Sequence, residues 1–586
     1  MDNAAHYYLM KYIFVSGGVV SGLGKGIASA SIGLLLKNLG IAITNVKIDM
    51  YLNVDAGTIR PQEHGEAFVT EDGLETDQDL GNYERFTGES LLRDNYLTTG
   101  QIYKTVIDRE RAFGYGGEDV EAVHHVTDEI IHRLESAGKK THAKVVIVEL
   151  GGTVGEYQNG IFFEASRILK LRQPKDVLQI HVTYLPFLKN IGELKSKPAQ
   201  QSTHLLNAMG IQPDFLVARS EKEIDQKRKE KLATFCNLQD EDIIGAPDLD
   251  SVYDVPEYMS KQKFGEKIAR KLHLKTKKDH LLSAWKKFAL LSHQTKQEVR
   301  IAMVGKYFAT GDYKLTDSYI SVIEALKQAS WSHGVRPVLD WIDSEDMEKK
   351  NIDLSLYDGI IVPQGWGSRG TEGKLQAVRQ AREKKIPYLG LCFGMQMAVI
   401  EFARNVVHLK GANSTEADPQ TAHPVIHVMP TQVEYLAKKQ YGGTIRLGSW
   451  PTILQDGTKI KNAYKKYSTD KTSPWFKGND FQNKSIIYER HRHRYEFNNE
   501  YREQLENAGL IISGLSPDGQ LVESIELPNH PFFVGTQFHP EYIARPITPH
   551  PIFLAFITAC RHSIAHNLTT DIQRGKIPQI KFWRLP

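Results

Sequence analysis

Two short stretches of the sequence combine residue types and spacings that could carry out chemistry. The first is Gly390-x-Cys392-x-Gly394, where an apolar run leads into a sharp turn and then a helical pattern. Small glycines permit a strained turn, and a thiol at a helix N-terminus is favoured as the thiolate, so the pattern predicts a nucleophile elbow with Cys in place of Ser. A lone cysteine is more often a core residue, so the hypothesis requires a base in the same domain.

The sequence Phe538-His539-Pro540-Glu541 supplies such a base at the end of a predicted strand. His539 could deprotonate Cys392, and Glu541 could orient the imidazole. A lone histidine is more often a satisfied surface or core residue, but the elbow together with His-x-Glu is much more specific than either alone. The three residues predict covalent catalysis by a thiol.

The second stretch is glycine-rich and runs from Ser16 to Gly26, between a short strand and a helical pattern. Glycines let successive backbone N–H groups face one anion, the helix N-terminus adds positive potential, and Lys25 can reach terminal phosphate oxygens. The spacing is unusual, because five residues separate Gly18 from Gly24 and Gly26 replaces the usual Ser or Thr after the lysine. A turn that serves packing alone is the alternative, and the strand–turn–helix context with its Gly-Lys pair disfavours it.

Carboxylates elsewhere in the chain must replace the missing hydroxyl if this loop works with a metal ion. Asp72, Asp77 and Asp79 crowd one polar stretch, and Glu149 ends the apolar run 145–148. Ligands of open α/β sheets bind at the carboxyl edge of the strands, which is where Glu149 is expected. Oxygen ligands beside nucleotide phosphates suit Mg²⁺. An acidic cluster by itself is usually a solvated loop, and the strand-end position of Glu149 favours the metal site.

The elements that position these residues alternate along the first half of the chain. A helix is predicted over residues 27–39, ended by Gly40. Strands alternating with helices predict an α/β fold with a parallel sheet covered on both faces. The predicted buried strands are 12–15, 41–47, 145–149, 177–183 and 215–219.

The second half is also α/β, with predicted strands at 300–304, 359–362, 387–391 and 532–538. Charge density rises over 261–296, which we interpret as a solvated helix at a domain boundary. Residues 465–483 are polar and predict a surface insertion, and the sequence after 565 gives no signal. The predicted division is a first domain over 1–273, a linker over 274–298, a second domain over 299–564 and a C-terminal tail over 565–586.

Composition excludes several classes of protein. The chain has 586 residues, of which 41% are hydrophobic and 24% charged, so it is neither wholly disordered nor fibrous. A net charge of +3 gives no general attraction to nucleic acid or membrane, and we expect neither as a partner. The three cysteines, Cys236, Cys392 and Cys560, are widely spaced, so no disulfide framework is expected. With no apparent membrane span, a cytoplasmic protein is predicted.

Longer motifs resemble those of one family. They include FVSGGVVSGLGKGI, KIDMYLNVDAGT, HGEAFVTEDGLETDQDLGNYERF, GELKSKPAQQS, LDSVYDVP, GLCFGMQ, ERHRHRYE and QFHPE. With them the chain resembles the CTP synthase family over about residues 12–559, and its second half separately resembles class I glutamine amidotransferases. The resemblance implies a P-loop-type amidoligase (synthetase) domain followed by a glutamine amidotransferase domain.

The resemblance also implies a reaction. ATP phosphorylates O4 of UTP to a 4-phosphoryl-UTP intermediate, ammonia released from L-glutamine attacks C4, and phosphate leaves to give CTP. Phosphorylation converts a poor leaving group into a good one, and an enclosed ammonia supply avoids loss to ammonium, which has no lone pair. The family further implies Mg²⁺, ATP as co-substrate, GTP as an allosteric activator, and a homotetramer.

The resemblance assigns roles to matching positions in the first domain. ATP would be held by Gly22, Leu23, Gly24, Lys25, Gly26, Ile27, Asp79 and Asp248. Mg²⁺ would be held by Asp79 and Glu149. UTP or CTP would be held by Ser21, Lys195, Lys197, Gln200 and Lys231, and His64 would lie at the ammonia passage.

In the second domain the resemblance gives Cys392 the γ-glutamyl thioester, with His539 as base oriented by Glu541. The backbone N–H groups of Gly365 and Phe393 would stabilise the oxyanion. Glutamine would also be held by Gln396, Glu416 and Arg494, with Glu416 on the ammonium and Arg494 on the carboxylate. Arg494 belongs to a run of arginines and histidines over 490–494 that otherwise resembles a short RNA-binding patch.

Three departures from the family pattern bear on function. Gln158 replaces an acid in the run 152–159, and Ala199 replaces a hydroxyl residue in the run 195–201. Both lie in the nucleotide-binding region, so we expect weak inhibition by CTP. Gln364 replaces a glycine beside Gly365. A side chain at positive φ costs about 1–2 kcal/mol, so the glutaminase would be weakened if that peptide must flip to form the oxyanion hole. Because Gly365 is kept, we expect that activity to be retained.

We interpret the chain as a two-domain glutamine-dependent amidoligase of the CTP synthase type. One alternative is a divergent paralogue that aminates a different nucleotide. Another is a non-catalytic nucleotide-binding or filament-forming protein, which the intact candidate catalytic residues argue against. A simple P-loop ATPase is the third, and it would have no need of the glutaminase half.

Overall fold

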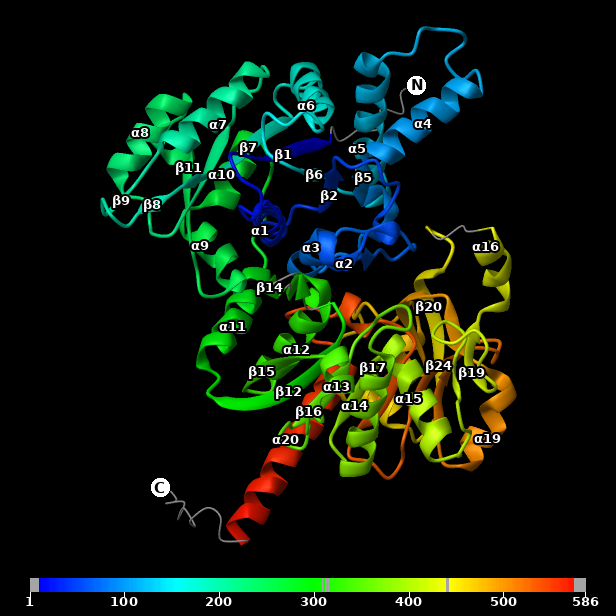
Figure 1. Cartoon of the computed structure of the whole chain (residues 1–586). Helices are drawn as coiled ribbons and strands as arrows, with labels where there is room; N and C mark the ends of the chain where they lie inside the picture. The colour runs from blue at the N-terminus through cyan, green and yellow to red at the C-terminus, as the bar shows by residue number, and fades with distance from the viewer. Residues whose placement is uncertain (1–9, 308, 311–312, 315, 439–441, 574–586) are drawn as a thin grey trace. The chain divides into compact units, whose positions relative to one another are not determined.

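A computed structural model describes residues 10–307, 309–310, 313–314, 316–438 and 442–573. The chain forms two compact units (Figure 1). Unit 1 comprises residues 1–58 and 70–290, and unit 2 comprises 59–69 and 291–586. The first domain predicted from the sequence includes residues 59–69, whereas the contacts of this short segment group it with unit 2.

Unit 1 is built on a seven-stranded sheet whose neighbouring strands are all parallel. The predicted parallel α/β fold is confirmed, and the five predicted strands are present with two more at the sheet edges. In spatial order the strands are β11 (Ile243–Pro247), β10 (Phe215–Ser220), β7 (Val177–Leu185), β1 (Lys11–Gly17), β6 (Val145–Leu150), β2 (Ile43–Asp49) and β5 (Tyr96–Thr98).

Helices cover both faces of this sheet. Ile13 and Val15 of β1 belong to one apolar core, and Tyr12 and Phe14 belong to another, because successive side chains of a strand point to opposite faces. The helices are α1 (Lys25–Asn38), α3 (Asp79–Thr87), α4 (Thr99–Arg111), α5 (Thr127–Lys140), α6 (Gly160–Arg172), α7 (Lys197–Ala208), α8 (Gln226–Cys236), α9 (Val255–Lys261), α10 (Phe264–Lys271) and α11 (Leu281–Gln294). Short strands are β4 (Glu75–Thr76), β8 (Phe187–Leu188) and β9 (Glu193–Leu194).

Unit 2 contains a nine-stranded mixed sheet. Its first five strands are parallel, and the last four continue it antiparallel. In spatial order they are β15 (Val335–Asp343), β12 (Gln297–Gly305), β16 (Gly359–Val362), β17 (Tyr388–Leu391), β25 (Phe533–Thr536), β24 (Val522–Glu526), β23 (Ile511–Leu515), β20 (Arg446–Leu454) and β21 (Ile486–His493).

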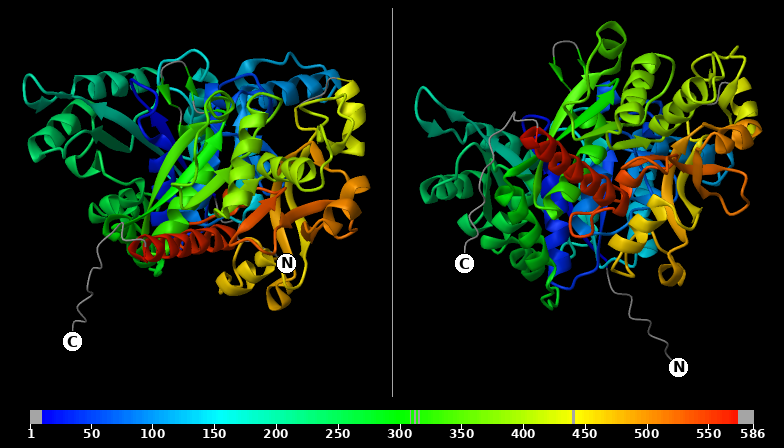
Figure 2. Two further views of the ribbon diagram at one scale, coloured as in Figure 1. Left: turned by 60° about the horizontal axis from the view of Figure 1, so that its bottom comes forward. Right: turned by 90° about the horizontal axis from the view of Figure 1, so that it is seen from below.

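Helices lie on both faces of this sheet as well, and α20 is the long red helix in both views of Figure 2. The helices are α2 (Pro61–His64), α12 (Ile320–Ser332), α13 (Ser344–Lys349), α14 (Thr371–Lys384), α15 (Phe393–Asn405), α16 (Val433–Ala437), α17 (Lys459–Tyr467), α18 (Asp480–Asn483), α19 (Arg502–Asn507) and α20 (Pro551–Gln573). The remaining strands are β3 (Phe68–Val69), β13 (Ala309–Thr310), β14 (Tyr313–Lys314), β18 (Asn413–Ser414), β19 (Pro424–Val428) and β22 (Tyr495–Phe497).

Two polar segments contribute more to the cores than their composition predicts. In the charged stretch 261–296, α11 buries Trp285, whose indole N–H donates to the Tyr253 carbonyl at 2.8 Å. In the segment predicted as a surface insertion, Trp475 is fully buried and donates to Ser468 Oγ at 2.9 Å. The surface prediction is therefore wrong around Trp475. The predicted tail begins inside α20, which continues to Gln573, and residues 574–586 lie outside the described residues.

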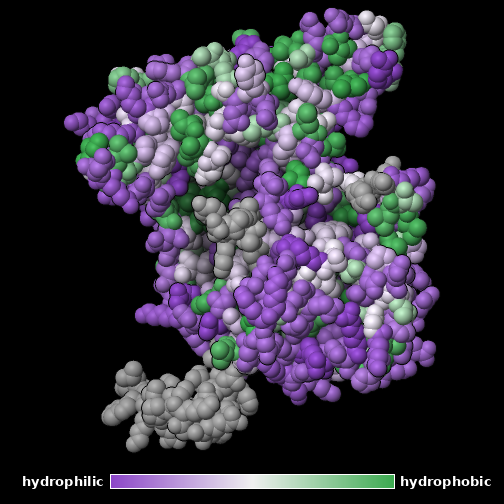
Figure 3. Space-filling view, viewed as in Figure 1, coloured by the Kyte–Doolittle hydropathy of each residue, from purple (hydrophilic) through white to green (hydrophobic). Residues whose placement is uncertain are grey.

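The face drawn in Figure 3 is mostly hydrophilic, with apolar residues in small groups. Within the described residues, no helix is both long enough and apolar enough to cross a membrane.

Candidate functional site

The glycine-rich loop of unit 1 joins β1 to α1, as the sequence predicted. Gly22 and Gly24 have φ values of +74° and +83°, in the left-handed region that glycine adopts without strain. Lys25 is the first residue of α1, and its ammonium donates to the Gly152 carbonyl at 2.7 Å. Burial lowers the pKa of Lys25, and the nearby Glu149 partly offsets this.

Gly26 explains how this loop dispenses with a hydroxyl. A Cβ built on Gly26 would lie 2.4 Å from Asp79 Oδ1, closer than real atoms approach. The carboxylate of Asp79, at the start of α3, therefore fills the space that a Ser or Thr side chain would need. This placement supports the expectation that an acid from elsewhere takes over the role of the hydroxyl.

Lys47 lies at the centre of the acidic residues beside the loop. Lys47 on β2 is directly opposite Glu149 on β6, and their Nζ and Oε1 atoms are 3.6 Å apart. The ammonium also bonds to Asp79 and lies 3.6 Å from Asp49 and 3.8 Å from Asp77. Burial tends to lower the pKa of Lys47, but these four carboxylates raise it well above its usual value, so the residue stays charged.

Glu149 is the most deeply placed of these acids. Burial raises its pKa to about 7, against the opposing charge of Lys47, and Tyr83 donates its hydroxyl hydrogen to it. Asp72, by contrast, accepts from the backbone N–H of Arg93 at 2.9 Å in an exposed loop away from this group. The structure therefore brings together Asp79 and Glu149 of the predicted acids, with Asp77 beside them.

The donor set near Lys25 fits a hard cation that is bound mainly by phosphate. Mg²⁺ in nucleotide sites takes one or two carboxylates and completes its shell with phosphate and water oxygens. Asp79 and Glu149 supply two carboxylates next to the loop, and burial leaves Glu149 with a raised pKa that a cation would lower. Among the described residues, no group of three or more acidic, histidine or cysteine side chains is arranged to hold a metal ion.

A cavity of about 170 Å³ opens beside the loop, lined by Gly22, Gly24 and Ile27 on one side. Its other walls include Arg219, Pro247 and Leu249, and the last two flank Asp248 in the sequence. The side chain of Asp248 accepts from Arg219 Nη2 at 2.8 Å instead of lining the cavity. The cavity adjoins the glycine-rich loop at Gly22 and Gly24.

The residues assigned to the pyrimidine nucleotide fall into two groups. Lys195 bonds to Glu193, and the charges of Lys195 and Lys231 both lower the pKa of that exposed carboxylate, so the two lysines lie close together. Lys197 begins α7 next to them. Gln200 is instead buried and donates to Ser196 Oγ at 2.9 Å, and Ser21 is exposed in the glycine-rich loop.

The departures in this region have different surroundings. Gln158 is exposed, whereas Glu156 accepts from the Thr153 backbone N–H at 2.7 Å and holds the turn that precedes it. Asn159 is buried and donates to the Gly151 and Thr153 carbonyls. Ala199 is fully buried in an apolar core with Leu216 and Leu232. The lost hydroxyl at Ala199 is thus replaced by core packing, and Gln158 remains the departure that is open to a ligand.

In unit 2, Cys392 adopts the strained geometry of a nucleophile elbow. It joins β17 to α15 with φ +50° and ψ −97°, a conformation that a side chain adopts only under constraint. Its backbone N–H donates to the Thr536 carbonyl at 2.6 Å. A Cβ on Gly390 would lie 2.7 Å from the Gly394 backbone, which explains the small residues around the turn. The thiol accepts from Gln537 Nε2 at 3.5 Å.

His539 and Glu541 are both buried beside this thiol. His539 Nδ1 and Glu541 Oε1 are 2.7 Å apart, so the carboxylate fixes the ring. Burial alone would lower the pKa of His539, but the charges of Glu541 and of Cys392 raise it to about 10. His539 Nε2 is buried and has no hydrogen-bond partner among the described residues. These charges favour the protonated form of the imidazole.

Cys392 and His539 line one small cavity of about 10 Å³. Its walls also contain four of the five predicted glutamine ligands, namely Gly365, Gln396, Glu416 and Arg494, whereas Phe393 is not among the lining residues. This volume is about that of one water molecule.

The charged ligands of this cavity are held in place. Glu416 accepts from the Gly367 backbone N–H at 2.7 Å, and burial raises its pKa. Arg494 donates to Gln432 Oε1 at 3.1 Å and to Thr444 Oγ1 at 2.9 Å. Gln396 donates to the Tyr495 carbonyl at 2.9 Å. An acid and an arginine at one cavity match the two charged ends of an amino acid.

Gly365 and Phe393 flank two buried lysines. Lys374 Nζ lies 3.4 Å from the Pro363 carbonyl, and Lys306 Nζ lies 3.0 Å from the Gly367 carbonyl. Both ammonium groups lie within 5 Å of the Phe393 ring centroid. A Cβ on Gly365 would lie 2.9 Å from Lys306 Cε, so a side chain at this position would require the end of Lys306 to shift.

The strain predicted at Gln364 is absent. Gln364 is not among the residues with positive φ, so its side chain costs no left-handed conformation. The side chain is buried and donates from Nε2 to Glu66 Oε1 at 2.9 Å. In this geometry the side chain has a hydrogen-bond partner and the backbone has an ordinary φ, so the cost predicted for a flipped 364–365 peptide does not arise here.

The run of arginines and histidines over 490–494 is buried throughout, which excludes the RNA-binding interpretation for these residues. Arg492 and Arg494 face the cavity, and Arg490 and His491 pack behind it. His64 ends α2 and is exposed within unit 2.

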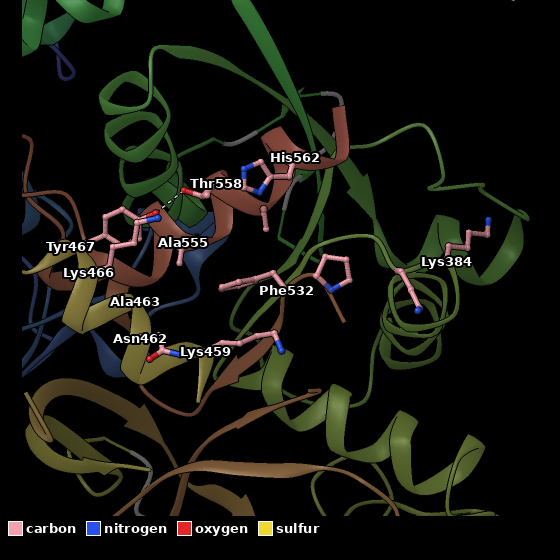
Figure 4. Close-up of a pocket in the computed structure, with 13 residues that line it drawn as sticks. Lys384, Lys459, Asn462, Ala463, Lys466, Tyr467, Phe532, Ala555, Thr558 and His562 are labelled. Atoms are coloured by element: carbon pink, nitrogen blue, oxygen red, sulfur yellow. Dashed lines mark hydrogen bonds between the residues drawn. The ribbon is translucent and has the colours of Figure 1, made fainter. Parts of the chain in front are cut away.

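A larger cavity of about 700 Å³ lies between α17 and α20 of unit 2 (Figure 4). It is lined by lysines, including Lys384, Lys459 and Lys466, over an apolar floor at Phe532. Tyr467 and Thr558 hydrogen-bond across one end at 2.8 Å. Its lining residues, as described, include none of those around Cys392, so we assign it no part in thiol chemistry.

Sequence reasoning missed several residues of both sites. Lys47 stood inside a predicted strand, and a lysine in an otherwise apolar buried strand was the available signal. Gln537 lies two residues before the predicted base His539, and this closeness in sequence was the available signal. Lys306, Lys374 and Arg219 gave no local signal, because only the fold brings them to the sites.

The two sites define a class of protein: a class I glutamine amidotransferase joined in one chain to a nucleotide-dependent synthetase. A family profile described as CTP synthase N-terminus matches residues 11–274, and one described as glutamine amidotransferase class-I matches residues 314–559. The chain is 48% identical to a CTP synthase of Caldanaerobacter subterraneus over 94% of this chain and 98% of that protein. It is 46% identical to a CTP synthase of Bacillus subtilis over the same shares of the two chains.

The chain therefore belongs to the CTP synthase family of glutamine-hydrolysing ligases. Among solved structures, the glutaminase domain of Trypanosoma brucei CTPS with bound acivicin is 36% identical, and the match covers 45% of this chain and 94% of that one with a TM-score of 0.39.

Proposed function

We propose that this protein converts UTP to CTP in an ATP-dependent reaction that uses ammonia from L-glutamine and passes through 4-phosphoryl-UTP. The observation that carries the proposal is the presence, in one chain, of a buried Cys392–His539–Glu541 constellation and a glycine-rich loop with Asp79 against Gly26. A thiol site of this kind releases ammonia, and a phosphate loop activates the oxygen that ammonia replaces.

In unit 1, Lys25 and the N-terminus of α1 bind the phosphates of ATP, and the cavity beside Ile27 takes the base and ribose. Asp79 and Glu149 would hold Mg²⁺, which supplies positive charge against the transferred phosphoryl group. Lys47 keeps the neighbouring carboxylates in place. Lys195, Lys197 and Lys231 suit the triphosphate of UTP, with Ser21 and Gln200 as further ligands.

In unit 2, Glu416 and Arg494 orient glutamine with its side-chain amide at Cys392. The thiolate attacks the amide carbon, and His539 gives its proton to the departing ammonia. The backbone N–H groups of Gly365 and Phe393 stabilise the oxyanion. Water then hydrolyses the γ-glutamyl thioester, with His539 as base, and His64 lies on the route of ammonia to unit 1.

Further parts of the proposal rest on the family alone. They are activation of glutamine hydrolysis by GTP, assembly as a homotetramer, and a cytoplasmic location. The domain limits predicted from the sequence, with a linker over 274–298, also stay a proposal.

Incubation with ATP, Mg²⁺, GTP and glutamine labelled with ¹⁵N in the side-chain amide tests the proposal. We expect ¹⁵N in the exocyclic amine of CTP when UTP is the acceptor. Parallel reactions with other nucleoside triphosphates identify a divergent specificity if label enters a different base. Absence of label from every base, with the protein folded, contradicts the proposed reaction.

A further inference from the structure

Residues 59–69 are attached to unit 2 by their backbone and by Glu66. The backbone N–H of Glu66 donates to the Asp317 carbonyl at 2.9 Å. Glu66 Oε2 accepts from the Ser321 backbone N–H at 3.0 Å, so this carboxylate caps the first turn of α12. The side chain of Glu66 is only 3% exposed. Segment 59–69 is thus anchored at the N-terminus of α12.

The same segment also contacts the catalytic histidine through one intermediate. The Tyr542 hydroxyl donates to the Ala67 carbonyl at 3.0 Å, and the Phe68 ring packs edge-on against Tyr542 at 5.2 Å. The Tyr542 ring in turn stacks on His539 at 4.8 Å. Segment 59–69 therefore adjoins the base of the thiol site as well as α12.

Gln364 connects Glu66 to the loop that carries the oxyanion donor. Its Nε2 donates to Glu66 Oε1 across 298 positions of sequence, and both side chains are buried. The Gln364 carbonyl lies 3.4 Å from the Tyr319 hydroxyl, which approaches from the start of α12. Because C=O and N–H of a trans peptide point in opposite directions, the N–H of Gly365 is aimed away from Tyr319.

We propose that Gln364 is a positioning residue for glutamine hydrolysis, whose bond to Glu66 sets the orientation of the Gly365 N–H in the oxyanion hole. The inference rests on the proposed glutaminase reaction. Two contacts fix the 364–365 peptide, one at the side chain through Glu66 and one at the carbonyl through Tyr319. Any displacement of segment 59–69 is then transmitted to the oxyanion donor, and the rate of hydrolysis follows the position of that segment.

The proposal assigns a function to a residue where the family has glycine. A glycine leaves the 364–365 peptide free to rotate, whereas Gln364 restrains it from a point outside the loop. Removal of a whole oxyanion donor typically costs about 10²–10³ in kcat, so a donor that is retained but misaligned is expected to cost less, about 10-fold or more.

Gln364→Glu tests the bond, because it places a carboxylate against Glu66. We expect kcat for glutamine hydrolysis to fall about 10-fold or more, with KM changed less than about threefold, since the charged glutamine ligands are untouched. Alkylation of Cys392 by iodoacetamide, followed on its peptide by mass spectrometry, needs the thiolate but no oxyanion hole. Its rate is expected to stay within about twofold of the wild-type value.

The exchanged pair Gln364→Glu with Glu66→Gln restores one donor and one acceptor with reversed polarity. Gln at position 66 still offers an oxygen to the Ser321 N–H, so kcat is expected to recover to within about threefold of wild type. Ser318→Ala is the matched control, since it removes the 3.4 Å bond from Ser318 Oγ to the Pro61 carbonyl without touching Gln364. We expect it to keep wild-type kcat.

Several results overturn the inference: a Gln364→Glu variant with wild-type kcat, a loss that the exchanged pair does not reverse, an equal loss in Ser318→Ala, or a parallel loss of alkylation. Thermal melting of each variant shows whether it is folded, and the exchanged pair provides the comparison if the single variant is not. A wild-type protein that does not hydrolyse glutamine contradicts the proposed function itself and is recognised before any variant is compared.

Discussion

The two sites of this protein differ in how many of their reacting groups the chain itself supplies. In unit 2 the thiol, the imidazole and the orienting carboxylate are already in place around a cavity of about 10 Å³. In unit 1 the cavity beside the phosphate loop is about 170 Å³, and a protein lysine, Lys47, offsets part of the charge of the neighbouring carboxylates. The reacting groups proposed for unit 2 belong to the chain, whereas those proposed for unit 1 belong to the nucleotides that bind there.

The difference follows from the chemistry of each reaction. A covalent mechanism needs a nucleophile and a base held by the protein, so their orientation can be built into the fold. Phosphoryl transfer consists mainly of positioning and charge stabilisation, and the phosphates and their cation complete the site. Variants that separate the two chemistries therefore test the comparison.

The largest effect is expected from Cys392→Ala. Removal of the nucleophile is expected to reduce glutamine-dependent CTP formation by about 10³-fold or more, because no other group can form the thioester. Formation of CTP from added ammonium chloride at pH 8–9 is expected to persist, because it bypasses the thiol. Spectrophotometric assay of CTP with either nitrogen source measures both rates. If glutamine still supports CTP formation in this variant, Cys392 is not the nucleophile.

Glu149→Gln is the counterpart in unit 1. We expect CTP formation to fall about 10²-fold with both glutamine and ammonia, because a candidate Mg²⁺ ligand is lost, while glutamine hydrolysis continues. The pKa of Glu149 is raised to about 7, so its contribution to stability is present below its unfolded pKa and lost as pH rises through 7. The variant should therefore melt about 1–3 °C above wild type at pH 8.

The stability gain of Glu149→Gln should shrink as the pH falls toward 5, because wild-type Glu149 then becomes neutral. Lys47 keeps Asp49, Asp77 and Asp79 as partners in the variant, so its charge stays compensated. Calorimetry at pH 5 and pH 8 measures both melting temperatures. A variant that is less stable than wild type at pH 8 would show that Glu149 is not a destabilising buried charge.

Glu541→Gln is expected to have a smaller effect in unit 2. Loss of the orienting charge should lower glutamine hydrolysis by about 10-fold to 100-fold. The pKa of His539 is raised to about 10, so its contribution to stability is complete below its unfolded pKa of about 6.5 and disappears as pH rises through 10. The difference in unfolding free energy between wild type and variant should therefore be largest near pH 6 and decrease toward pH 10.

Denaturant titrations at several pH values measure that difference. A difference that grows with pH would contradict the assignment of an imidazolium to His539 in the folded protein.

The smallest effect is expected at Gln158, which is exposed in the chain. Wild-type protein is expected to be inhibited only weakly by CTP. Gln158→Glu restores a carboxylate that can accept hydrogen bonds from the ligand, which is expected to strengthen inhibition about 10-fold, the value of one charge-assisted hydrogen bond. Gln158→Ala serves as the control and should stay near wild type. Strong inhibition of the wild-type protein would refute the interpretation of Gln158.

Much of the fold could be predicted from the sequence, because the parallel strands are short continuous apolar runs. β15 was missed because Arg336 and Asp340 interrupt its apolar residues, and β5 because it has only three residues. β21 was missed because it buries Arg490 and His491 in a polar run that resembles surface. Buried charge is compensated by partners from distant strands, such as the Arg446–Glu523 pair, and a single sequence does not show those partners.

The residues of the candidate sites also divide into those that a local motif reveals and those that only tertiary contacts reveal. Cys392, His539 and Lys25 belong to local motifs whose spacing has a mechanical reason, so they could be found without a structure. Glu66 and Gln364 belong to no shared motif, and their hydrogen bond exists only because residues 59–69 pack on unit 2. The assignment of that segment depends on tertiary contacts, and sequence order alone placed it with its neighbours in the chain.

An oxygen beside the glycine-rich loop could come from a serine or threonine at position 26 or from the carboxylate of Asp79. The close approach of Gly26 and Asp79 makes these two arrangements mutually exclusive. A serine or threonine at 26 would collide with the carboxylate, and a shorter residue at 79 would leave the loop with neither oxygen. If the two positions change one at a time, the intermediate protein has either no oxygen at positions 26 and 79 or two side chains crowded into one space. Grafting a conventional loop onto this scaffold therefore requires positions 26 and 79 to change together.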